Sequence, residues 1–331
     1  MSVISVIVPV YNGEKTIKET INSALGQAFS DIEIIIINDG SDDSTLDILS
    51  SIQDPRLKVF SYTNAGASAS RNRGFDHAVG EFIAFLDADD LWTPDKLEAQ
   101  LKVLQENPQA AVAYSWTDRI NESGKFIRKG SYITATGNVF AQLLLTDFLD
   151  NGSNPLIRRH AFAEVGGFDE SLPAGQDWDL YLRLAARYQF VAVPLPQVLY
   201  RVSTNSISSN VLRLELACLQ VIERAFSQAS QSLQYLKRYS LANLYKYLLF
   251  KSFEGPVEQQ KKLPAARFLW YAIKNDPGLL KTRVVWKVLF RIILVTLLSP
   301  QRSQVLLVAA KQFFSINALL VHTQTDPSTI N

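Results

Sequence analysis

Short apolar runs alternate with amphipathic segments along the first hundred residues of the chain. The runs are VISVIVPV, IEIIIIND, LKVFSY and EFIAFLD, and the segments between them are EKTIKETINSAL, STLDILSSI and SASRNRGFDHAV. Runs this short and this rich in β-branched residues are typical of buried strands, whereas the intervening segments have the pattern of helices. The alternation predicts an α/β fold around a mostly parallel sheet.

A polar cluster follows each of the predicted strands. PVYNGE follows the first strand, NDGSDDS the second, NAGAS the third and DADD the fourth. In open α/β sheets, ligands bind beyond the carboxyl ends of the strands. Because stability requires no polar convergence at that edge, we expect the four clusters to form a binding site.

The pattern beyond residue 90 predicts further elements. Thr93 and Pro94 have the residue types of an N-cap and a first helical position, which predicts a helix to about Asn107. AVAYSW predicts another strand, followed by a polar excursion over residues 118–136. A helix is predicted over residues 176–188, with a buried face that includes Leu180, Leu182, Leu184 and Ala185.

From Val211 onward the pattern is helical. Breaks are expected near Gly255-Pro256, Pro277-Gly278 and Pro300, and the tail after Thr323 is polar. We therefore divide the chain into an α/β domain, residues 1–210, and a helical extension, residues 211–331.

Composition is that of a folded protein from a reducing compartment. The chain has 331 residues, of which 47% are hydrophobic, which is enough for a catalytic domain and a second module. Its single cysteine, Cys218, excludes an internal disulfide framework and a cysteine-rich metal site. The first apolar run lacks a preceding basic region and stops at Pro9, so we expect a strand there rather than a signal peptide. The expected location is cytoplasmic.

Charge differs sharply between the two parts of the chain. Residues 1–210 carry 17 Lys and Arg against 26 Asp and Glu, a net charge of −9, and residues 211–331 carry 16 against 6, a net charge of +10. The acidic part suits a metal site. The basic part suits an anionic partner such as a lipid surface or nucleic acid.

Three carboxylates crowd together in FLDADDLW, residues 85–92. Asp87, Asp89 and Asp90 follow an apolar run, and like charges this close repel unless a cation or a proton intervenes. Mg²⁺ or Mn²⁺ bound by diphosphate oxygens would neutralise Asp87 and Asp89. The alternative is an acidic turn that caps the following helix.

Two residues at other strand ends are candidates for nucleotide contacts. Asp39 follows four isoleucines and could accept hydrogen bonds from a base or a ribose, or else cap a helix, a role that Ser41 or Asp42 could fill instead. Tyr11 could stack on a base, or else be a half-buried ring with its hydroxyl in solvent.

The successive motifs SVIVPVYNGEKTI, IIINDGSDDST, NAGASASRNRG and AFLDADD resemble those of the family 2 inverting glycosyltransferases in order and spacing. The resemblance covers about residues 1–210 and implies the GT-A fold, which is Rossmann-like, with a nucleotide-sugar half (1–110) and an acceptor half (111–210). It implies that Asp39 holds the base, that Asp87 faces the ribose and that Asp89 binds the metal. It also implies that the nucleotide pocket is lined or approached by Pro9, Tyr11, Glu14 and Arg71.

The resemblance continues in NPLIRRHAFAEVGGFDESLPAGQDWDLYLRLA, where Asp177 matches the family's general base. The sequence departs from the family at Gln176, where a glutamate is usual, and at Ser203, where many relatives have a histidine. Arg201 is then the remaining candidate for a cationic contact near the diphosphate. The alternative for Asp177 is an N-cap of its own helix.

These features together predict an enzyme that transfers one sugar from a nucleotide diphosphate donor, with a UDP-sugar as the first candidate, to a hydroxyl of a glycan or lipid-linked acceptor. A divalent metal would assist the reaction. One alternative is a noncatalytic nucleotide-sugar-binding or scaffolding protein. Another is a nucleotidyltransferase, although PVYNGEKT is not the glycine-rich, basic loop that would hold a triphosphate.

The basic extension contains an amphipathic segment, KTRVVWKVLFRIILVTLL, over residues 281–298. Its uninterrupted apolar run is much shorter than the roughly 20 residues that span a bilayer, and the later stretch from Val305 is broken by Lys311, Gln312 and Asn317. We expect this part to lie on an anionic membrane surface, at the cytoplasmic face. The alternative is a helical bundle that packs on the catalytic domain or on a second subunit. Nucleic acid is not expected, because no recognition motif accompanies the charge.

Overall fold

The computed structural model of the chain describes residues 2–203, 210–254 and 262–309, together with residues 319, 323 and 325–329. The chain divides into two compact units. The first consists of residues 1–143, 147–172 and 176–203, and the second of residues 144–146, 173–175 and 204–331.

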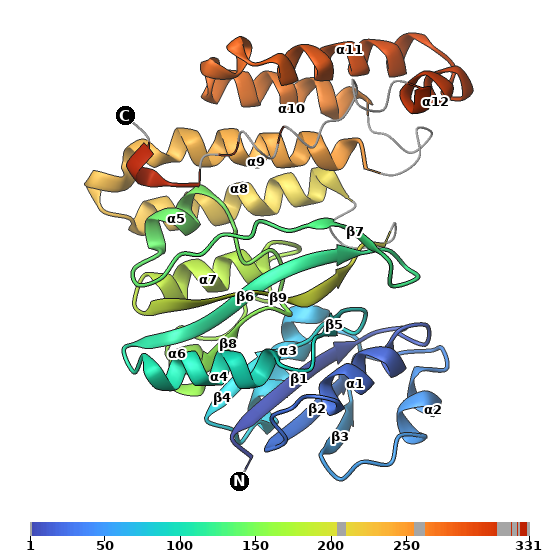
Figure 1. The fold of residues 1–331 in the computed structure, drawn as a ribbon, viewed down its shortest axis with the longest axis vertical. Helices are drawn as coiled ribbons and strands as arrows, with labels where there is room; N and C mark the ends of the chain where they lie inside the picture. The colour runs from blue at the N-terminus through green and yellow to red at the C-terminus, as the bar shows by residue number, and fades with distance from the viewer. Residues whose placement is uncertain are drawn as a thin grey trace. The chain divides into compact units, whose positions relative to one another are not determined.

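The first unit is built on a mixed sheet. In the described part of the chain, nine strands form it in the order β3-β2-β1-β4-β8-β6-β9-β5, with β7 paired to β6 (Figure 1). The strands are β1 (Ile4–Val10), β2 (Ile32–Asn38), β3 (Leu57–Ser61), β4 (Phe82–Phe85), β5 (Leu91–Trp92), β6 (Ala110–Ile120), β7 (Phe126–Lys129), β8 (Leu156–Arg158) and β9 (Gln189–Arg201).

The first four strands are parallel, as the alternating pattern predicts. β1 pairs with β2 and β4, and β2 pairs with β3, all in parallel register. Every residue of β1 and β2 is buried, which explains their continuous apolar sequences. Beyond β4 the sheet is mixed, because β8 runs antiparallel to both β4 and β6 while β9 runs parallel to β6.

Helices connect these strands. They are α1 (Ile17–Leu25), α2 (Thr45–Ser50), α3 (Ala67–His77), α4 (Lys96–Glu106), α5 (Phe140–Leu145), α6 (Arg159–Glu164) and α7 (Gln176–Ala185). In α1 the buried apolar positions, Ile17, Ile21 and Ala24, have helical spacing. α3 approaches the sheet closely at Gly74, where an added Cβ would lie 2.3 Å from Cγ2 of Ile7. A glycine at this position is therefore a packing requirement.

Three predicted elements differ in extent. α4 begins at Lys96 rather than beside Thr93, because Leu91 and Trp92 pair with β9 and Asp95 takes the N-cap position. β6 continues to Ile120, and β7 returns antiparallel to it, so part of the predicted polar excursion is strand. The predicted helix from residue 176 ends at Ala185 and not at residue 188. The expected buried face of α7 is confirmed, since Leu180, Leu182, Leu184 and Ala185 are at most 4% exposed.

The second unit is helical, and its described residues contain no strand, as expected. It contains α8 (Val211–Gln228), α9 (Lys237–Ser252), α10 (Lys262–Asn275), α11 (Arg283–Leu297) and α12 (Pro300–Ala309), with 3-10 helices at Gln231–Leu236, Pro277–Lys281 and Pro327–Thr329. The breaks expected at Pro277 and Pro300 are confirmed, and the one at residues 255–256 lies outside the described residues. Of the helices that the structure describes, none combines the length and hydropathy needed to span a bilayer.

Candidate functional site

The loops after β1 and β2 are fastened to each other by reciprocal hydrogen bonds. The Asn12 N–H donates to Oγ of Ser41, and the Asp42 N–H donates to Oδ1 of Asn12. Nearby, the Ser44 N–H donates to Oε2 of Glu14. Glu14 therefore stabilises the loop after β2. If Glu14 lies beside a nucleotide, as predicted, the nucleotide is next to these two loops.

Pro9 and Tyr11 differ in their surroundings. Pro9 is buried within β1, where it is in register with Ile37 of β2. Tyr11, just beyond the end of β1, is 55% exposed. Because the ring is not packed in the core, it is accessible to a planar ligand at this edge of the sheet.

Asp39 follows β2 and is 3% exposed. Its Oδ1 accepts a hydrogen bond from the Ala65 N–H at 2.9 Å, and its Oδ2 accepts one from the Gly66 N–H at 2.8 Å. Arg73 adds a longer ion pair at 3.4 Å. The alternative role as a helix cap does not apply, because the N-cap of α2 is Ser44. Asp39 instead fixes the loop before α3.

The three carboxylates after β4 have three different environments. Asp87 is paired with the buried guanidinium of Arg71, from α3, at 2.5 Å. Asp90 is fully buried, and its oxygens accept hydrogen bonds from the Ser153 hydroxyl at 2.6 Å and from the Arg201 N–H at 2.9 Å. Burial, followed by the neighbouring charges of Asp89 and Asp87, raises the pKa of Asp90 well above its ordinary value. Asp90 is therefore committed to the fold.

Asp89 is the carboxylate without such support. Within the described ranges, no other residue donates a hydrogen bond from its side chain to the Asp89 carboxylate. Burial, and next the charge of Asp87, raises the pKa of Asp89 to about 6. In the same part of the chain, no three His, Cys, Asp or Glu side chains are grouped as metal ligands. The chemistry fits a cation held by one carboxylate and completed by oxygen ligands from a substrate.

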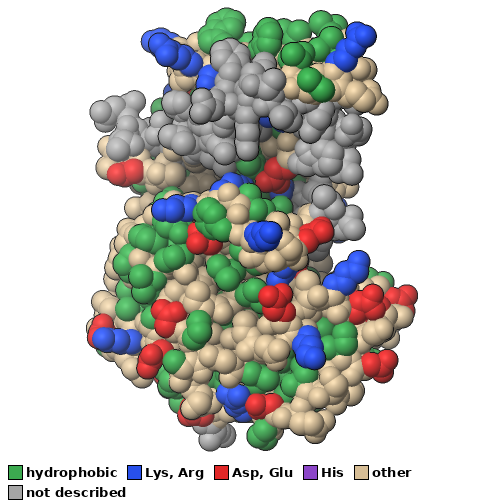
Figure 2. All heavy atoms as spheres, turned by 45° about the vertical axis from the view of Figure 1, so that its right-hand side comes forward, with side chains coloured by type: hydrophobic (Ala, Val, Ile, Leu, Met, Phe, Trp, Pro, Cys, Tyr) green, Lys and Arg blue, Asp and Glu red, His purple; other side chains and the backbone are tan. Residues whose placement is uncertain are grey.

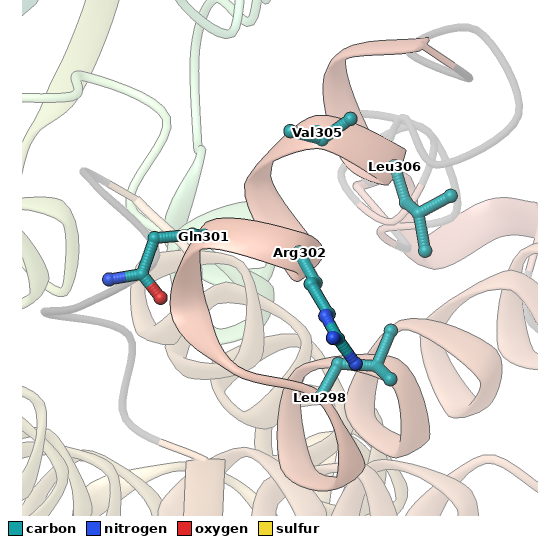
Figure 3. A pocket seen from close by; sticks show the side chains of 5 residues that line it. All are labelled: Leu298, Gln301, Arg302, Val305 and Leu306. Atoms are coloured by element: carbon teal, nitrogen blue, oxygen red, sulfur yellow. The ribbon is translucent and has the colours of Figure 1, made fainter.

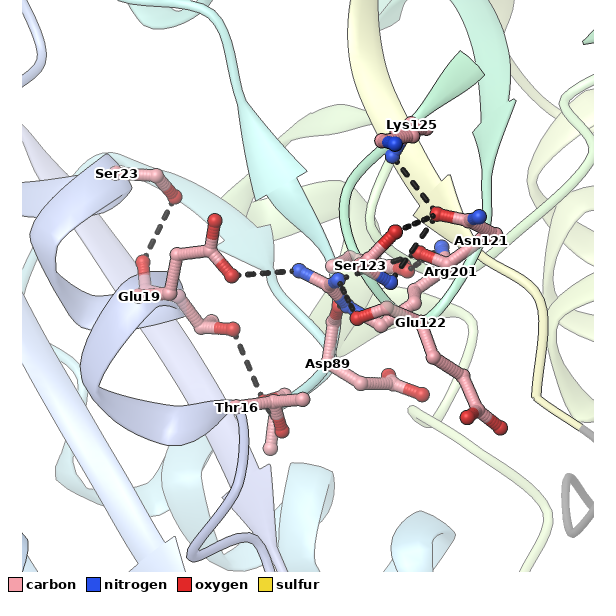
Figure 4. A network of polar contacts seen from close by, with 12 residues as sticks. Thr16, Glu19, Ser23, Asp89, Asn121, Glu122, Ser123, Lys125 and Arg201 are labelled. Carbon is pink, nitrogen blue, oxygen red and sulfur yellow. Dashed lines mark hydrogen bonds and ion pairs between the residues drawn. The ribbon is translucent and has the colours of Figure 1, made fainter. Parts of the chain in front are cut away.

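Arg201, at the end of β9, holds the Asp89 segment in place. Its Nε donates to the carbonyl of Asp89 at 2.8 Å, its Nη2 to Oε2 of Glu19 at 2.8 Å, and its Nη1 to the carbonyl of Glu122 at 2.8 Å. Figure 4 shows the guanidinium between α1 on one side and the turn at residues 121–123 on the other. The side chain is 3% exposed. A direct contact with a diphosphate, as expected from the sequence, would require the guanidinium to leave these partners.

We expect Arg201→Met to lower the free energy of unfolding by about 2–4 kcal/mol, because the carbonyl groups of Asp89 and Glu122 lose the hydrogen bonds that the buried guanidinium donates and Glu19 loses its ion pair. Urea denaturation measures the change. The matched control is Arg187→Met, which removes an ion pair with Glu164 whose side chains are 55% and 53% exposed and which should cost less than about 1 kcal/mol. Equal effects of the two substitutions would contradict the role given to Arg201.

Asp177 lies in the first turn of α7 and is half-buried. Its Oδ1 accepts a hydrogen bond from the Trp178 N–H at 3.0 Å. Burial raises the pKa of Asp177, the positive charge of Arg71 lowers it, and the negative charge of Asp87 raises it. Asp177 is thus within electrostatic range of the Arg71–Asp87 pair. The structure brings together three residues from α3, from the segment after β4 and from α7.

The two positions where the sequence departs from the family have simple surroundings. Gln176 donates from Nε2 to the carbonyl of Leu172 at 3.2 Å. A glutamate carboxylate could not donate this bond, so the amide suits the local backbone. Ser203 is half-buried at the end of the described part of the first unit.

The loop NGSN, residues 151–154, contacts two of the three clustered carboxylate residues and was not predicted from the sequence. The Ser153 oxygen accepts from the Asp87 N–H at 3.0 Å while its hydroxyl donates to Asp90. Asn154 is buried, accepting from the Ser115 N–H and donating to the Ser115 carbonyl. The available signal was a polar tetrapeptide directly before the apolar run of β8.

A second carboxylate near Asp177 was also missed. Burial, followed by the charge of Asp177, raises the pKa of Asp147 well above its ordinary value. Tyr181, buried on α7, donates from its hydroxyl to the carbonyl of Asn151 at 2.9 Å. The half of the site around Asp177 is therefore acidic.

Known proteins are similar to this chain in sequence. The chain is 36% identical over 187 residues to an uncharacterized glycosyltransferase of Rickettsia bellii, which covers 55% of this chain and 27% of that protein. It is 29% identical over 184 residues to the chondroitin synthase of Pasteurella multocida, which covers 55% of this chain and 19% of the synthase. The chain thus matches about a quarter or less of the length of these two relatives.

Solved structures show the same fold. The mannosyltransferase PcManGT of Pyrobaculum calidifontis, in complex with GDP-Man and Mn²⁺, has a TM-score of 0.59 at 18% identity and covers 96% of this chain and 85% of that chain. TarS 1–349 of S. aureus, in complex with UDP-GlcNAc, has a TM-score of 0.56 at 19% identity, and the match covers 82% of this chain and 88% of the TarS chain. The sequence model described as glycosyltransferase like family 2 matches residues 5–252. The chain therefore belongs to glycosyltransferase family 2 and has the GT-A fold.

Proposed function

We propose that the protein is a metal-dependent inverting glycosyltransferase that moves a sugar from a nucleotide diphosphate donor to a hydroxyl of a glycan or lipid-linked acceptor. The observation that carries the proposal is the convergence of Arg71, Asp87, Asp89 and Asp177 from separate elements of the sheet edge. Convergence of this kind costs stability, because like charges are brought together out of water. A functional use offsets that cost.

On this proposal the donor lies along the ends of β1, β2 and β4. Tyr11 stacks on the base, with Pro9 beneath it, and Asp39 and Glu14 keep the surrounding loops in place. Asp87, oriented by Arg71, faces the ribose. A UDP-sugar is the first donor to test and a GDP-sugar the second, since one of the similar structures carries UDP-GlcNAc and another carries GDP-Man.

Asp89 would hold Mn²⁺ or Mg²⁺. A divalent ion bound there would supply positive charge to the diphosphate as it leaves. The backbone of Asp89 is fixed by the guanidinium of Arg201. Arg201 then acts on the donor through the position of Asp89.

Asp177 would take the proton of the acceptor hydroxyl. Inversion requires a base on the acceptor side while the nucleotide diphosphate leaves from the opposite side of the sugar. The raised pKa of Asp177 strengthens it as a base relative to an exposed aspartate, since a carboxylate that is costly to keep charged accepts a proton more readily.

Titration calorimetry tests the donor site. UDP, GDP and dTDP are titrated into the purified protein with and without Mn²⁺. We expect one nucleotide to bind, and to bind more tightly with the metal. If none binds in either condition, the transferase proposal fails.

A noncatalytic nucleotide-sugar-binding protein is the alternative outcome. Binding without release of nucleotide diphosphate from the matching sugar donor, in the presence of acceptor extracts or of water alone, would favour that alternative. On the enzymatic reading, the protein works at the cytoplasmic face of a membrane that carries lipid-linked acceptors. The single cysteine and the basic second unit support this location.

A further inference from the structure

Helix α11 in the second unit has two apolar faces. One face is buried and consists of Val284, Val285, Val288 and Val295. The opposite face consists of Trp286, Phe290, Ile293 and Leu297, which are 62%, 52%, 51% and 76% exposed. Their spacing of four, three and four residues aligns them in a single stripe, which we call the outer face of α11. Two opposite apolar faces are more than the single apolar stripe that a surface helix usually buries.

The apolar surface continues beyond the end of α11. Val305 and Leu306 of α12 are 68% and 45% exposed. They line a hollow of about 460 Å³ together with Leu298, Gln301 and Arg302 (Figure 3). In Figure 2, hydrophobic side chains gather along the upper edge, over the helices labelled α10 to α12 in Figure 1, with Lys and Arg side chains beside them. Exposed apolar surface that is contiguous in this way marks an interaction site.

The charged residues of the segment that carries this surface have one sign. The sequence contains no acidic residue between Asp276 and Asp326. Lys281, Arg283 and Arg302 are exposed, and on the helical wheel Arg283 lies next to the stripe that begins at Trp286. Arg291 is directed elsewhere, since its guanidinium lies 4.8 Å from the centre of the Phe253 ring.

We propose that the outer face of α11, with the start of α12, docks on a lipid bilayer that carries anionic headgroups. The indole of Trp286 and the aliphatic side chains enter the boundary between headgroups and acyl chains, while Lys281, Arg283 and Arg302 contact the headgroups. The charge pattern selects this occupant over a second copy of the chain. A two-fold contact between two such faces would oppose the same cations across the interface, with no acidic partner between Asp276 and Asp326.

This inference adds a docking surface to the membrane location given above, and it does not depend on the donor chemistry. Flotation of the full chain tests it with vesicles of phosphatidylcholine alone and with vesicles that also contain phosphatidylglycerol, at low and at physiological salt. We expect the protein to float with the anionic vesicles and to be released in part by salt.

Three variants separate the contributions. Trp286→Ser with Leu297→Ser removes the two side chains of the face with the highest exposed fractions and should weaken partition by about tenfold or more. Leu216→Ser is the matched control, because Leu216 of α8 is 70% exposed and lies outside the face, so its partition should stay within about twofold of the unchanged protein. Arg283→Gln with Arg302→Gln should weaken binding to anionic vesicles by roughly fivefold per charge and leave binding to neutral vesicles as it is.

Two results overturn the proposal: unchanged protein that stays at the bottom with anionic vesicles at low salt, or a Trp286→Ser, Leu297→Ser variant that floats like the Leu216→Ser control. Light scattering without lipid can give a third contrary result. If the unchanged chain is a dimer and the Trp286→Ser, Leu297→Ser variant is a monomer, the face binds a second copy of the chain instead of a membrane. Circular dichroism melts of all variants check folding. Nucleotide binding, measured on the same preparations, reports separately on the donor site.

Discussion

Asp177→Asn should slow nucleotide release from the sugar donor by about 10²–10⁴-fold, the usual contribution of a general base. This loss corresponds to roughly 3–5 kcal/mol of activation free energy. Asparagine has the shape of aspartate and keeps an oxygen that can accept the hydrogen bond from the Trp178 N–H, so the start of α7 should be unchanged. Nucleotide affinity should stay within about twofold, because only the acceptor side is altered. Single-turnover kinetics and calorimetry on the same variant measure the two quantities.

The neighbouring carboxylate provides the control for this assignment. Asp147 lies within electrostatic range of Asp177 and shares its acidic environment. Asp147→Asn leaves the proposed base in place, so the rate should fall much less than in Asp177→Asn. If Asp147→Asn is the variant that loses activity and Asp177→Asn is not, the base has been assigned to the wrong residue.

The pH profile gives an independent measure. Only ionised Asp177 can accept a proton, so activity falls on the acid side as the carboxylate becomes protonated. Because burial raises the pKa of Asp177, this fall should occur at a higher pH than for an exposed aspartate. This fall on the acid side of the pH profile should be absent from the residual activity of Asp177→Asn. If the fall persists unchanged in the variant, it reports the ionisation of a residue other than Asp177.

The placement of the proposed donor-site residues just after strands was predictable, because it depends on local sequence and on one rule of topology. Tyr11, Asp39 and Asp87 each lie within a few residues after a continuous apolar run, and such runs in alternation with helices form parallel strands. The carboxyl ends of parallel strands lie at one edge. Their placement at one edge of the sheet therefore follows from their positions in the sequence.

The supports of the site were not predictable in the same way. Arg201 meets Glu19 across 182 residues and Asp89 across 112 residues of sequence. Ser153 contacts Asp90 from a loop without periodicity, across 63 residues. These contacts depend on β8 and β9 being inserted into the sheet out of chain order, next to β4 and β5. Nothing in the local pattern of a single sequence encodes that insertion.

The start of α4 also shows that a long-range contact can override a prediction made from local sequence. Thr93 and Pro94 have the residue types of a helix start, but the backbone N–H of Thr93 donates to the carbonyl of Gln197, beside the β5–β9 pair. Asp95 then becomes the N-cap. A long-range strand pairing thus displaced a local signal by two residues, without changing the existence of the helix.

The environments of the three clustered carboxylates indicate which one is available for a metal. Asp87 has the Arg71 guanidinium, and Asp90 has the Ser153 hydroxyl and a backbone N–H. Asp89 is flanked by both charges and has no comparable donor within the described residues. A cation at Asp89 would reduce the repulsion among all three, which is why a substitution there should affect both binding and stability.

Asp89→Ala should abolish the gain in nucleotide affinity that Mn²⁺ confers, a loss of at least about tenfold, while affinity without metal stays as in the unchanged protein. In the absence of ligands the variant should melt at a slightly higher temperature than the unchanged protein, because it removes a carboxylate whose charged form is disfavoured by burial and by the charge of Asp87. Calorimetry with and without Mn²⁺ measures the first effect, and thermal melts measure the second. Both measurements are needed, because replacing a residue that serves only folding would lower the melting temperature, whereas replacing a metal ligand should not. A variant that still responds to Mn²⁺ would exclude Asp89 as the essential ligand and leave Asp87 as the remaining candidate among the three.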